Sequence, residues 1–306
     1  MTSETQILPT PSASIDPSAS QSSGEAPSRL RQVLRQMRKS KLALPGGAIV
    51  LFFIIVAILA PILAPHDPYT NDLISMLMPP SWEHPFGTDE LGRDILSRIV
   101  IGARLSILEG MFSVALAMLI GVPFGMVSGY AGGRTDAILM RVIDVMLAFP
   151  GVLLAIVIVS ILGPSLVNAM IAVAVYTVPI FARLARGSTL SVMQEPYIEA
   201  CYSAGMRHHR VLLKHIFPNI AHTLWVMAAL RVALAILTAS SLSFLGLGAQ
   251  APSPEWGAML AAGRNYMLIA PHVVIFPGGA IVLLVLGINL FQDGLRVALD
   301  PKMAER

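Results

Sequence analysis

The sequence predicts an all-α, polytopic integral membrane protein with six transmembrane helices, and two observations lead to this fold class. First, 55% of the 306 residues are hydrophobic and only 13% are charged, whereas a soluble domain carries roughly 25% charged residues. Second, the charged residues gather in short intervals that separate long apolar runs, as is typical of helices that cross a bilayer. The formal net charge of +3 gives no support to a nucleic-acid-binding surface.

The amino-terminal part of the chain falls into three segments. Residues 1–27 are rich in Ser, Pro, Thr and Ala, a composition that predicts a disordered cytoplasmic tail. Residues 28–41 carry basic side chains with apolar residues between them at helical spacing, which predicts an amphipathic segment on the cytoplasmic membrane surface. Residues 42–64 contain no charged residue and are long enough for a first span. The length of this run and its distance from Met1 argue against a cleavable signal peptide.

Five more apolar runs complete the six expected spans. They cover residues 101–130, 137–162, 166–181, 221–248 and 273–291. Six spans place both termini on the same side of the membrane. Basic residues are frequent in the tail and in the intervals on that side, while the opposite side has only Arg93, Arg98 and Arg264. The positive-inside rule therefore predicts cytoplasmic termini.

This topology assigns the remaining segments. Residues 65–100 are expected to be extracytoplasmic, residues 101–296 to form a five-helix core, and residues 297–306 to form a cytoplasmic tail. Within the core, residues 182–219 make a polar cytoplasmic loop in which apolar residues recur at the spacing of short amphipathic helices. A cytoplasmic loop that is too long for a turn is typical of a docking surface.

One stretch of this loop favours a rigid elbow. Its main residues are Glu199, Ala200, Cys201, Gly205, His215 and Pro218. The small side chain of Ala200 lets a partner helix approach, Gly205 permits a sharp turn, and Pro218 fixes the entry to the next span. Because Cys201 is the only cysteine, the chain has no intrachain disulfide.

The elbow resembles the EAA loop of ABC importer permeases, in which Glu-Ala-Ala is followed by three residues, Gly and a later Pro. Cys201 stands in place of the second Ala. Further strings resemble those of the dipeptide, oligopeptide and nickel importers, and they lie within residues 84–94, 241–248, 254–257 and 289–301. The chain is thus identified as a member of the C-type permease subunits of these importers.

The resemblance implies a type I ABC importer permease fold in the bacterial inner membrane. It implies several partners: a homologous second permease, two cytoplasmic ATP-binding subunits and an extracytoplasmic substrate-binding protein, besides the lipid bilayer. The six elbow residues would couple the chain to the ATPases, and a di- or oligopeptide would enter the cytoplasm by alternating access. Since the sequence has no G-x-x-x-x-G-K-[ST] string, ATP is expected on the partners. We expect no catalytic residue, cofactor or metal on this chain.

Arg231 lies near the middle of the fifth expected span, where a charged side chain costs roughly 2.5–3.5 kcal/mol. It either faces the transport pathway and attracts a substrate carboxylate, or it forms a structural ion pair. An alternative function is a secondary transporter or channel that needs no ATPase. Such proteins have inverted repeats and ionisable groups at the midplane, and Arg231 alone gives that alternative little support.

Other charged residues are expected to be structural. Arg141 and Asp144 stand three residues apart on one helical face and predict an ion pair. Arg104 and Glu109 are expected near the outer interface, where both can reach water. Two clusters could suggest other chemistry. The histidines of the cytoplasmic loop are interpreted as solvated or helix-capping rather than as metal ligands; they are His208, His209 and His215. The acidic and basic outer residues are interpreted as a folded element that touches the binding protein or the second permease; they are Asp89, Glu90, Arg93 and Asp94.

Overall fold

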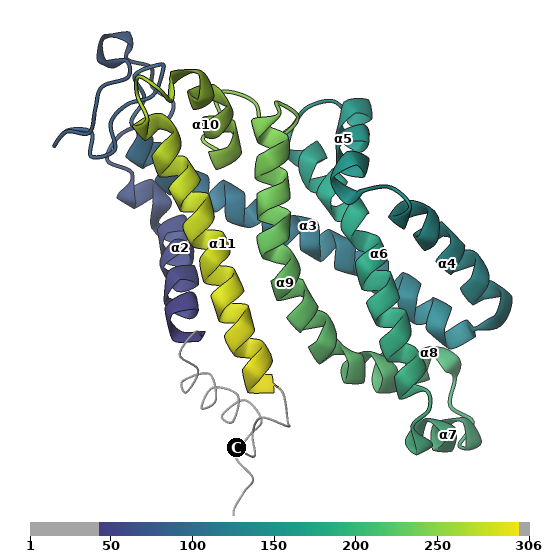
Figure 1. Cartoon of the computed structure of the whole chain (residues 1–306). Helices are drawn as coiled ribbons and strands as arrows, with labels where there is room; N and C mark the ends of the chain where they lie inside the picture. The colour runs from purple at the N-terminus through teal and green to yellow at the C-terminus, as the bar shows by residue number, and fades with distance from the viewer. Residues whose placement is uncertain (1–42, 300–306) are drawn as a thin grey trace, which may run out of the picture.

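The computed structural model describes residues 43–299, and this part of the chain is built from helices (Figure 1). Five of them are long and apolar enough to cross a membrane: α2 (Ala43–Leu63), α3 (Ile95–Ala131), α6 (Leu166–Val192), α9 (Phe217–Phe244) and α11 (His272–Leu299). The predicted all-α class is therefore confirmed. The segments expected at residues 1–27 and 28–41, and residues 300–306 of the expected tail, lie outside the described residues.

The third expected span, residues 137–162, is not one straight helix. The chain forms α4 (Gly133–Leu147) and α5 (Gly151–Leu162), which meet at an angle of 88°. Pro150 stands at the break, because proline lacks an N–H and disfavours a helical conformation in the residue before it. With 12 residues, α5 is about 18 Å long and too short to cross a bilayer alone. The described residues contain six crossings if the bent pair counts as one.

Several helix boundaries differ from the hydropathy runs, and two of the differences have a specific contact as their cause. α3 begins at Ile95, outside the expected run, because the Asp94 carboxylate accepts the Ser97 N–H at 2.7 Å and caps the helix. α6 continues past residue 181 to Val192, because its arginines there pair with acidic residues of α4. α11 continues to Leu299, so residues 297–299 of the expected tail are helical.

The helices are arranged around α3, which crosses the bundle obliquely and packs against α2, α9 and α6 (Figure 1). α2 and α11 lie side by side at one edge, and the bent pair packs against α6 at the other. The buried residues form two clusters. One contains Phe181 and joins α3, α6 and α9, and the other contains Trp256 and joins α2, α3 and α11.

A ladder of glycines brings α3 and α6 close together. Gly121, Gly125 and Gly129 recur every four residues of α3 and face the backbone of α6. A Cβ atom on Gly121 would lie 2.6 Å from the carbonyl oxygen of Val178, and one on Gly129 would lie 2.9 Å from that of Arg186. Small residues at this spacing let membrane helices pack backbone against backbone.

The bundle has two differently built ends (Figure 1). We call one of them the α10 end. It contains α10 (Trp256–Gly263), η3 (Arg264–Tyr266) and the loop of residues 64–94, which includes the short turn η1 (Leu73–Ser75). At the other, the α7 end, α7 (Pro196–Ser203) and α8 (His208–Val211) lie beyond α6, and the last turns of α11 point in the same direction.

Candidate functional site

α7 projects from the bundle on short connections (Figure 1). α6 ends at Val192 and α7 begins with Pro196, whose fixed φ suits a first helical turn. Ile198 is the fully buried residue of α7, and it belongs to the same core cluster as Val211 and Ile216. Glu199 is exposed. α7 is therefore held by an apolar anchor and presents its other faces to the surroundings.

The turn after α7 is a Schellman motif centred on Gly205. This glycine has a φ of +71°, in the left-handed region that side chains disfavour. The N–H of Met206 donates to the carbonyl oxygen of Cys201 at 3.1 Å, and the N–H of Gly205 donates to that of Tyr202 at 2.9 Å. These two bonds satisfy the last carbonyls of α7 and reverse the chain. The expected sharp turn at Gly205 is thus present.

The chain then returns to the bundle through α8 and a π-helical turn, Leu212–Ile216. Pro218 lies in the first turn of α9, directly after the π-helical turn, and has no N–H to donate to that turn. His215 is half-buried, and its carbonyl oxygen accepts the Asn219 side-chain N–H at 2.6 Å. His215 and Pro218 therefore stand at the base of the elbow, separate from the α7 segment that carries Glu199.

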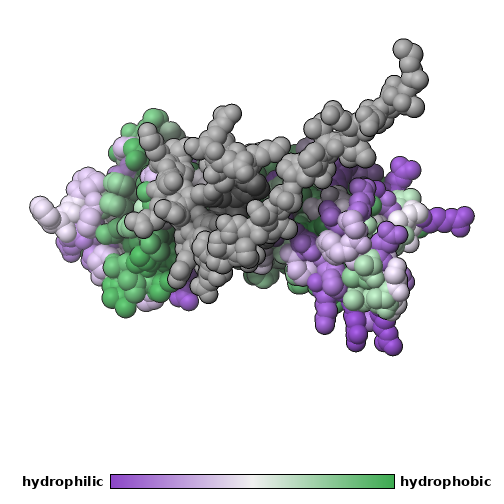
Figure 2. Space-filling view, turned by 90° about the horizontal axis from the view of Figure 1, so that it is seen from below, coloured by the Kyte–Doolittle hydropathy of each residue, from purple (hydrophilic) through white to green (hydrophobic). Residues whose placement is uncertain are grey.

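Seen from the α7 end, the molecule shows a hydrophilic region and, apart from it, a hydrophobic patch (Figure 2). Hydrophilic residues gather on the side where α7 and α8 project, and hydrophobic ones on the side of α2. The exposed polar residues of the elbow are Gln194, Glu195, Glu199, Arg207, His208, His209, Arg210 and Lys214. Ala200 is also exposed, and Cys201 is a half-buried free thiol. The elbow thus presents a charged, mostly basic surface.

Polar contacts tie the elbow region to neighbouring helices, and the sequence did not reveal them. The hydroxyl of Tyr130, at the end of α3, lies 2.6 Å from Nδ1 of His208, so this exposed histidine is hydrogen-bonded to a neighbouring helix. Arg186 of α6 donates to both carboxylate oxygens of Asp136 at 2.6 Å. Pairing between residues of different helices leaves no local pattern in the sequence. The position of Arg186, just beyond the apolar run of residues 166–181, was the only sign that it pairs with another helix.

The expected Arg141–Asp144 pair is wrong. Asp144 accepts instead from Arg183 of α6 at 2.6 Å, because the neighbouring helix offers a partner with better geometry than the same helical face. Glu109 is also misjudged: it is 0% exposed rather than in contact with water. Neither of its carboxylate oxygens has a hydrogen-bond partner among the described residues.

Arg231 lies in α9 and is half-buried. Its Nε atom is buried and has no hydrogen-bond partner, and the ion pairs found within residues 43–294 do not include it. The structural ion pair considered above is therefore not formed within this part of the chain. Its guanidinium remains the charged group of α9 that a substrate carboxylate or another subunit could neutralise.

The charged residues of the α10 end form a folded element, as expected. Arg93 donates from Nε to Asp89 at 2.7 Å and from Nη2 to Glu90 at 3.0 Å. Arg98 donates to the carbonyl oxygens of Pro68 at 2.8 Å and Ser253 at 3.2 Å. The side chains of both arginines are 4% exposed. Buried charges with this many partners hold loops together, and their arrangement is unlike an acid/base site.

The string of residues 254–257 completes this element. Glu255 caps α10 and accepts the N–H groups of Gly257 and Ala258, both at 2.8 Å. Burial raises the pKa of the Glu255 carboxyl. Trp256 is fully buried and donates from its indole N–H to the carbonyl oxygen of Ile99 at 3.1 Å. The two resembling strings of the α10 end are therefore structural and fix α3, α9 and α10 to one another.

Comparisons with known proteins agree with this geometry. Residues 121–305 match the family described as binding-protein-dependent transport system inner membrane component, and residues 28–80 match the N-terminal TM domain of oligopeptide transport permease C. The chain is also similar to structures of the MetNI methionine ABC transporter in inward-facing conformations, with a TM-score of 0.54 and 18% identity, over 67% of this chain and 98% of that one. This similarity confirms the predicted type I permease fold.

Closer relatives are known from their sequences. The dipeptide transport system permease protein DppC of Alkalihalophilus pseudofirmus is 47% identical over 99% of both chains. The glutathione transport system permease protein GsiD of Pectobacterium atrosepticum is 47% identical over 89% of this chain and 91% of its own. These relatives are permease subunits rather than enzymes. The chain therefore belongs to the family of binding-protein-dependent transport system inner membrane components, as a C-type permease subunit of an ABC importer in the inner membrane.

Proposed function

We propose that this permease, together with a homologous second permease, forms the pathway by which an ABC importer moves di- or oligopeptides into the cytoplasm. The observation that carries the proposal is the 47% identity, over 99% of both chains, to a protein named as a dipeptide permease. A relative named for glutathione transport is also 47% identical, over 89% of this chain, and glutathione is itself a peptide. Two ATP-binding subunits and a substrate-binding protein complete the assembly.

The proposed orientation places the α7 end in the cytoplasm and the α10 end outside. Exposed basic residues concentrate at the α7 end, among them Arg207, Arg210 and Lys214, and such residues favour the cytoplasmic side. The last turns of α11 point in the same direction as α7, so both termini are cytoplasmic in this orientation. The α10 end is then available to the substrate-binding protein.

The elbow is the proposed coupling site to the ATPases, with Glu199, Ala200 and Cys201 on the docking helix and Gly205 at its turn. ATP binding closes the ATPase dimer and displaces α7, and the displacement passes to α6 through the short connection of residues 193–195. Since α6 is packed on α3 backbone against backbone, both helices move together. The bundle then changes between inward-open and outward-open states by rigid-body motion.

The test is co-purification of the complex with its ATPases, combined with ATP-dependent uptake of a labelled dipeptide into proteoliposomes. We expect the double variant Glu199→Arg, Gly205→Pro to insert into the membrane but to lose ATPase association and uptake together. Glu83→Arg is the matched control, because Glu83 is an exposed carboxylate at the opposite end. It should retain ATPase association. Unchanged association in the double variant would refute the coupling site, and uptake without ATPases would establish a secondary carrier.

Arg231 is the proposed pathway residue. Its half-buried, unpaired guanidinium is suited to attract the terminal carboxylate of a peptide. We expect Arg231→Met to reduce uptake of a free dipeptide far more than uptake of the same dipeptide with an amidated carboxyl terminus. Equal losses for both substrates would assign Arg231 a structural role and leave the rest of the proposal in place.

A further inference from the structure

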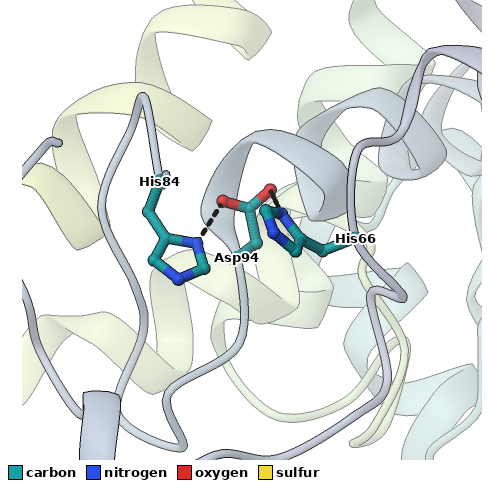
Figure 3. A group of neighbouring side chains, drawn as sticks. All are labelled: His66, His84 and Asp94. Atoms are coloured by element: carbon teal, nitrogen blue, oxygen red, sulfur yellow. Dashed lines mark hydrogen bonds and ion pairs between the residues drawn. The ribbon is translucent and has the colours of Figure 1, made fainter. Parts of the chain in front are cut away.

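Three side chains at the α10 end lie together, with two imidazoles directed at the two oxygens of one carboxylate (Figure 3). His66 follows α2 along the chain, His84 lies in the loop of residues 64–94, and Asp94 caps α3. Nδ1 of His84 lies 3.0 Å from Oδ1 of Asp94, and Nδ1 of His66 lies 3.8 Å from Oδ2. The three ligand atoms all lie within 4.8 Å of one another. Segments from three parts of the chain thus present two imidazoles and one carboxylate to a common centre.

From this geometry we infer that His66, His84 and Asp94 form a binding site for a divalent zinc ion. Zinc is bound at about 2.0–2.2 Å by imidazole nitrogen and carboxylate oxygen, so neighbouring ligand atoms of a tetrahedral site lie about 3.3 Å apart. His84 lies 3.0 Å from one oxygen of the Asp94 carboxylate and His66 lies 3.8 Å from the other, and one ligand atom from each residue lies within 4.8 Å of the other two. Two imidazoles favour zinc over magnesium or calcium, which prefer oxygen ligands.

Hydrogen bonding does not explain why the His66 ring lies beside Asp94. The 3.0 Å contact of His84 fits an N–H donated to Asp94, but 3.8 Å is too long for a hydrogen bond from His66. The ring of His66 makes no other hydrogen bond within the described residues, and only its backbone N–H is engaged, by Ser97 Oγ at 3.0 Å. A metal ion held by the carboxylate and both rings would give the His66 ring nitrogen a partner.

The surroundings fix the ligands as a metal site requires. Ser97 donates its N–H to Oδ2 of Asp94 at 2.7 Å and its hydroxyl at 2.6 Å, and such outer contacts orient a ligating carboxylate. The Asp94 side chain is fully buried, that of His84 is 14% exposed, and that of His66 is 39% exposed. The ion can therefore enter beside His66, and three protein ligands leave a fourth position for water. When bound, zinc would fasten the end of α2 to the start of α3.

The test uses the purified transporter complex after treatment with a chelator. We expect the wild type to bind one zinc per copy of this chain by elemental analysis and to melt several degrees higher with zinc, whereas magnesium should have no effect. His66→Gln and His84→Gln should each lose both effects. His222→Gln is the control, because His222 is exposed on α9, away from this cluster, and it should behave as the wild type does.

A spectroscopic measurement keeps the inference testable if the variants unfold. Cobalt added to the wild-type complex should give the strong visible absorption of a four-coordinate site, and one equivalent of zinc should remove it. Zinc bound equally by wild type and both variants would assign the binding to other histidines and overturn the inference. Absence of zinc binding and of a cobalt spectrum in the wild type would also overturn it. ATP-dependent uptake is not needed for any of these measurements, so their outcome is independent of the proposed transport function.

Discussion

At the α10 end Arg93 and Arg98 are buried and paired, whereas the basic side chains of the elbow at the α7 end are exposed. Arg93 and Arg98 are each 4% exposed and hold loops from several parts of the chain. The basic residues of the elbow, such as Arg210, are exposed, and the anchor of α7 is apolar. The difference indicates that one end is built to stay fixed and the other to offer its charges to a partner. Stability and coupling can therefore be disturbed separately.

The largest effect is expected at the fixed end. Arg93→Met would leave Asp89 and Glu90 without this partner, and loss of one member of a buried ion pair costs about 3–5 kcal/mol. The melting temperature of the purified permease should fall strongly, and the yield of folded protein with it. Arg210→Met is the control from the elbow and should change stability by less than about 0.5 kcal/mol. Equal effects of the two substitutions would remove the contrast between the ends.

A smaller loss is expected at the cap of α10. Glu255→Ala leaves the N–H groups of Gly257 and Ala258 without their acceptor, at a cost of about 1–3 kcal/mol.

Glu255 should also make stability depend on pH. Because burial raises its pKa above the ordinary 4.5, the folded protein retains a proton that the unfolded chain releases, so stability is full below about pH 4.5 and declines as the pH rises through the raised pKa. Melting temperatures measured across this pH range should vary less with pH for Glu255→Gln than for the wild type. The same pH dependence in both proteins would contradict the assignment of this effect to Glu255.

At the elbow we expect a modest loss from Gly205→Ala. A Cβ atom at this position would meet nothing within 4 Å. The loss of folding free energy therefore comes only from placing a side chain on a left-handed backbone, which costs about 1–2 kcal/mol. Gly205→Asn should cost less, because Asn tolerates this conformation better. Gly187→Ala is the matched control, since Gly187 is helical, equally open and not left-handed, and it should stabilise α6 slightly. Coupling, measured as transport-stimulated ATPase activity, should follow the same order. A loss for Gly187→Ala as large as that for Gly205→Ala would show that added bulk matters more than conformation.

The smallest effect is expected from Arg183→Ala. The side chains of the Arg183–Asp144 pair are 56% and 52% exposed, and exposed pairs contribute about 0–1 kcal/mol. Arg186→Ala should cost more, because Arg186 makes a two-point contact with a less exposed Asp136. The melting temperatures of the two variants should be measured at low and at high salt. Only the Arg186→Ala variant should differ measurably from the wild type.

Hydropathy was sufficient to predict the all-α fold, because a bilayer imposes the same length on every apolar crossing. The turn at Gly205 was equally predictable, since a glycine after a short amphipathic run is a local signal. The bend between α4 and α5 was missed because an average over the apolar run hides the single Pro150 on which the bend depends. That proline was a usable signal.

The partners of charged residues were harder to predict, because they are decided by packing. Asp144 pairs with Arg183 across two helices instead of with Arg141 along one. Glu109 stands near the start of an apolar run, yet packing of neighbouring helices encloses it completely. The convergence of His66, His84 and Asp94 has the same origin, since the loop of residues 64–94 must fold before these side chains meet.

The contact between α2 and α11 has a consequence for biosynthesis. A Cβ atom on Gly287 of α11 would lie 2.5 Å from the Ile49 side chain of α2, so the first and last long helices fit closely together. Gly287 is made 238 residues after Ile49, a delay of roughly 10–50 s at ribosomal rates of about 5–20 residues per second. During that interval the newly inserted α2 has only lipid or the cell's insertion machinery against the face that α11 finally covers.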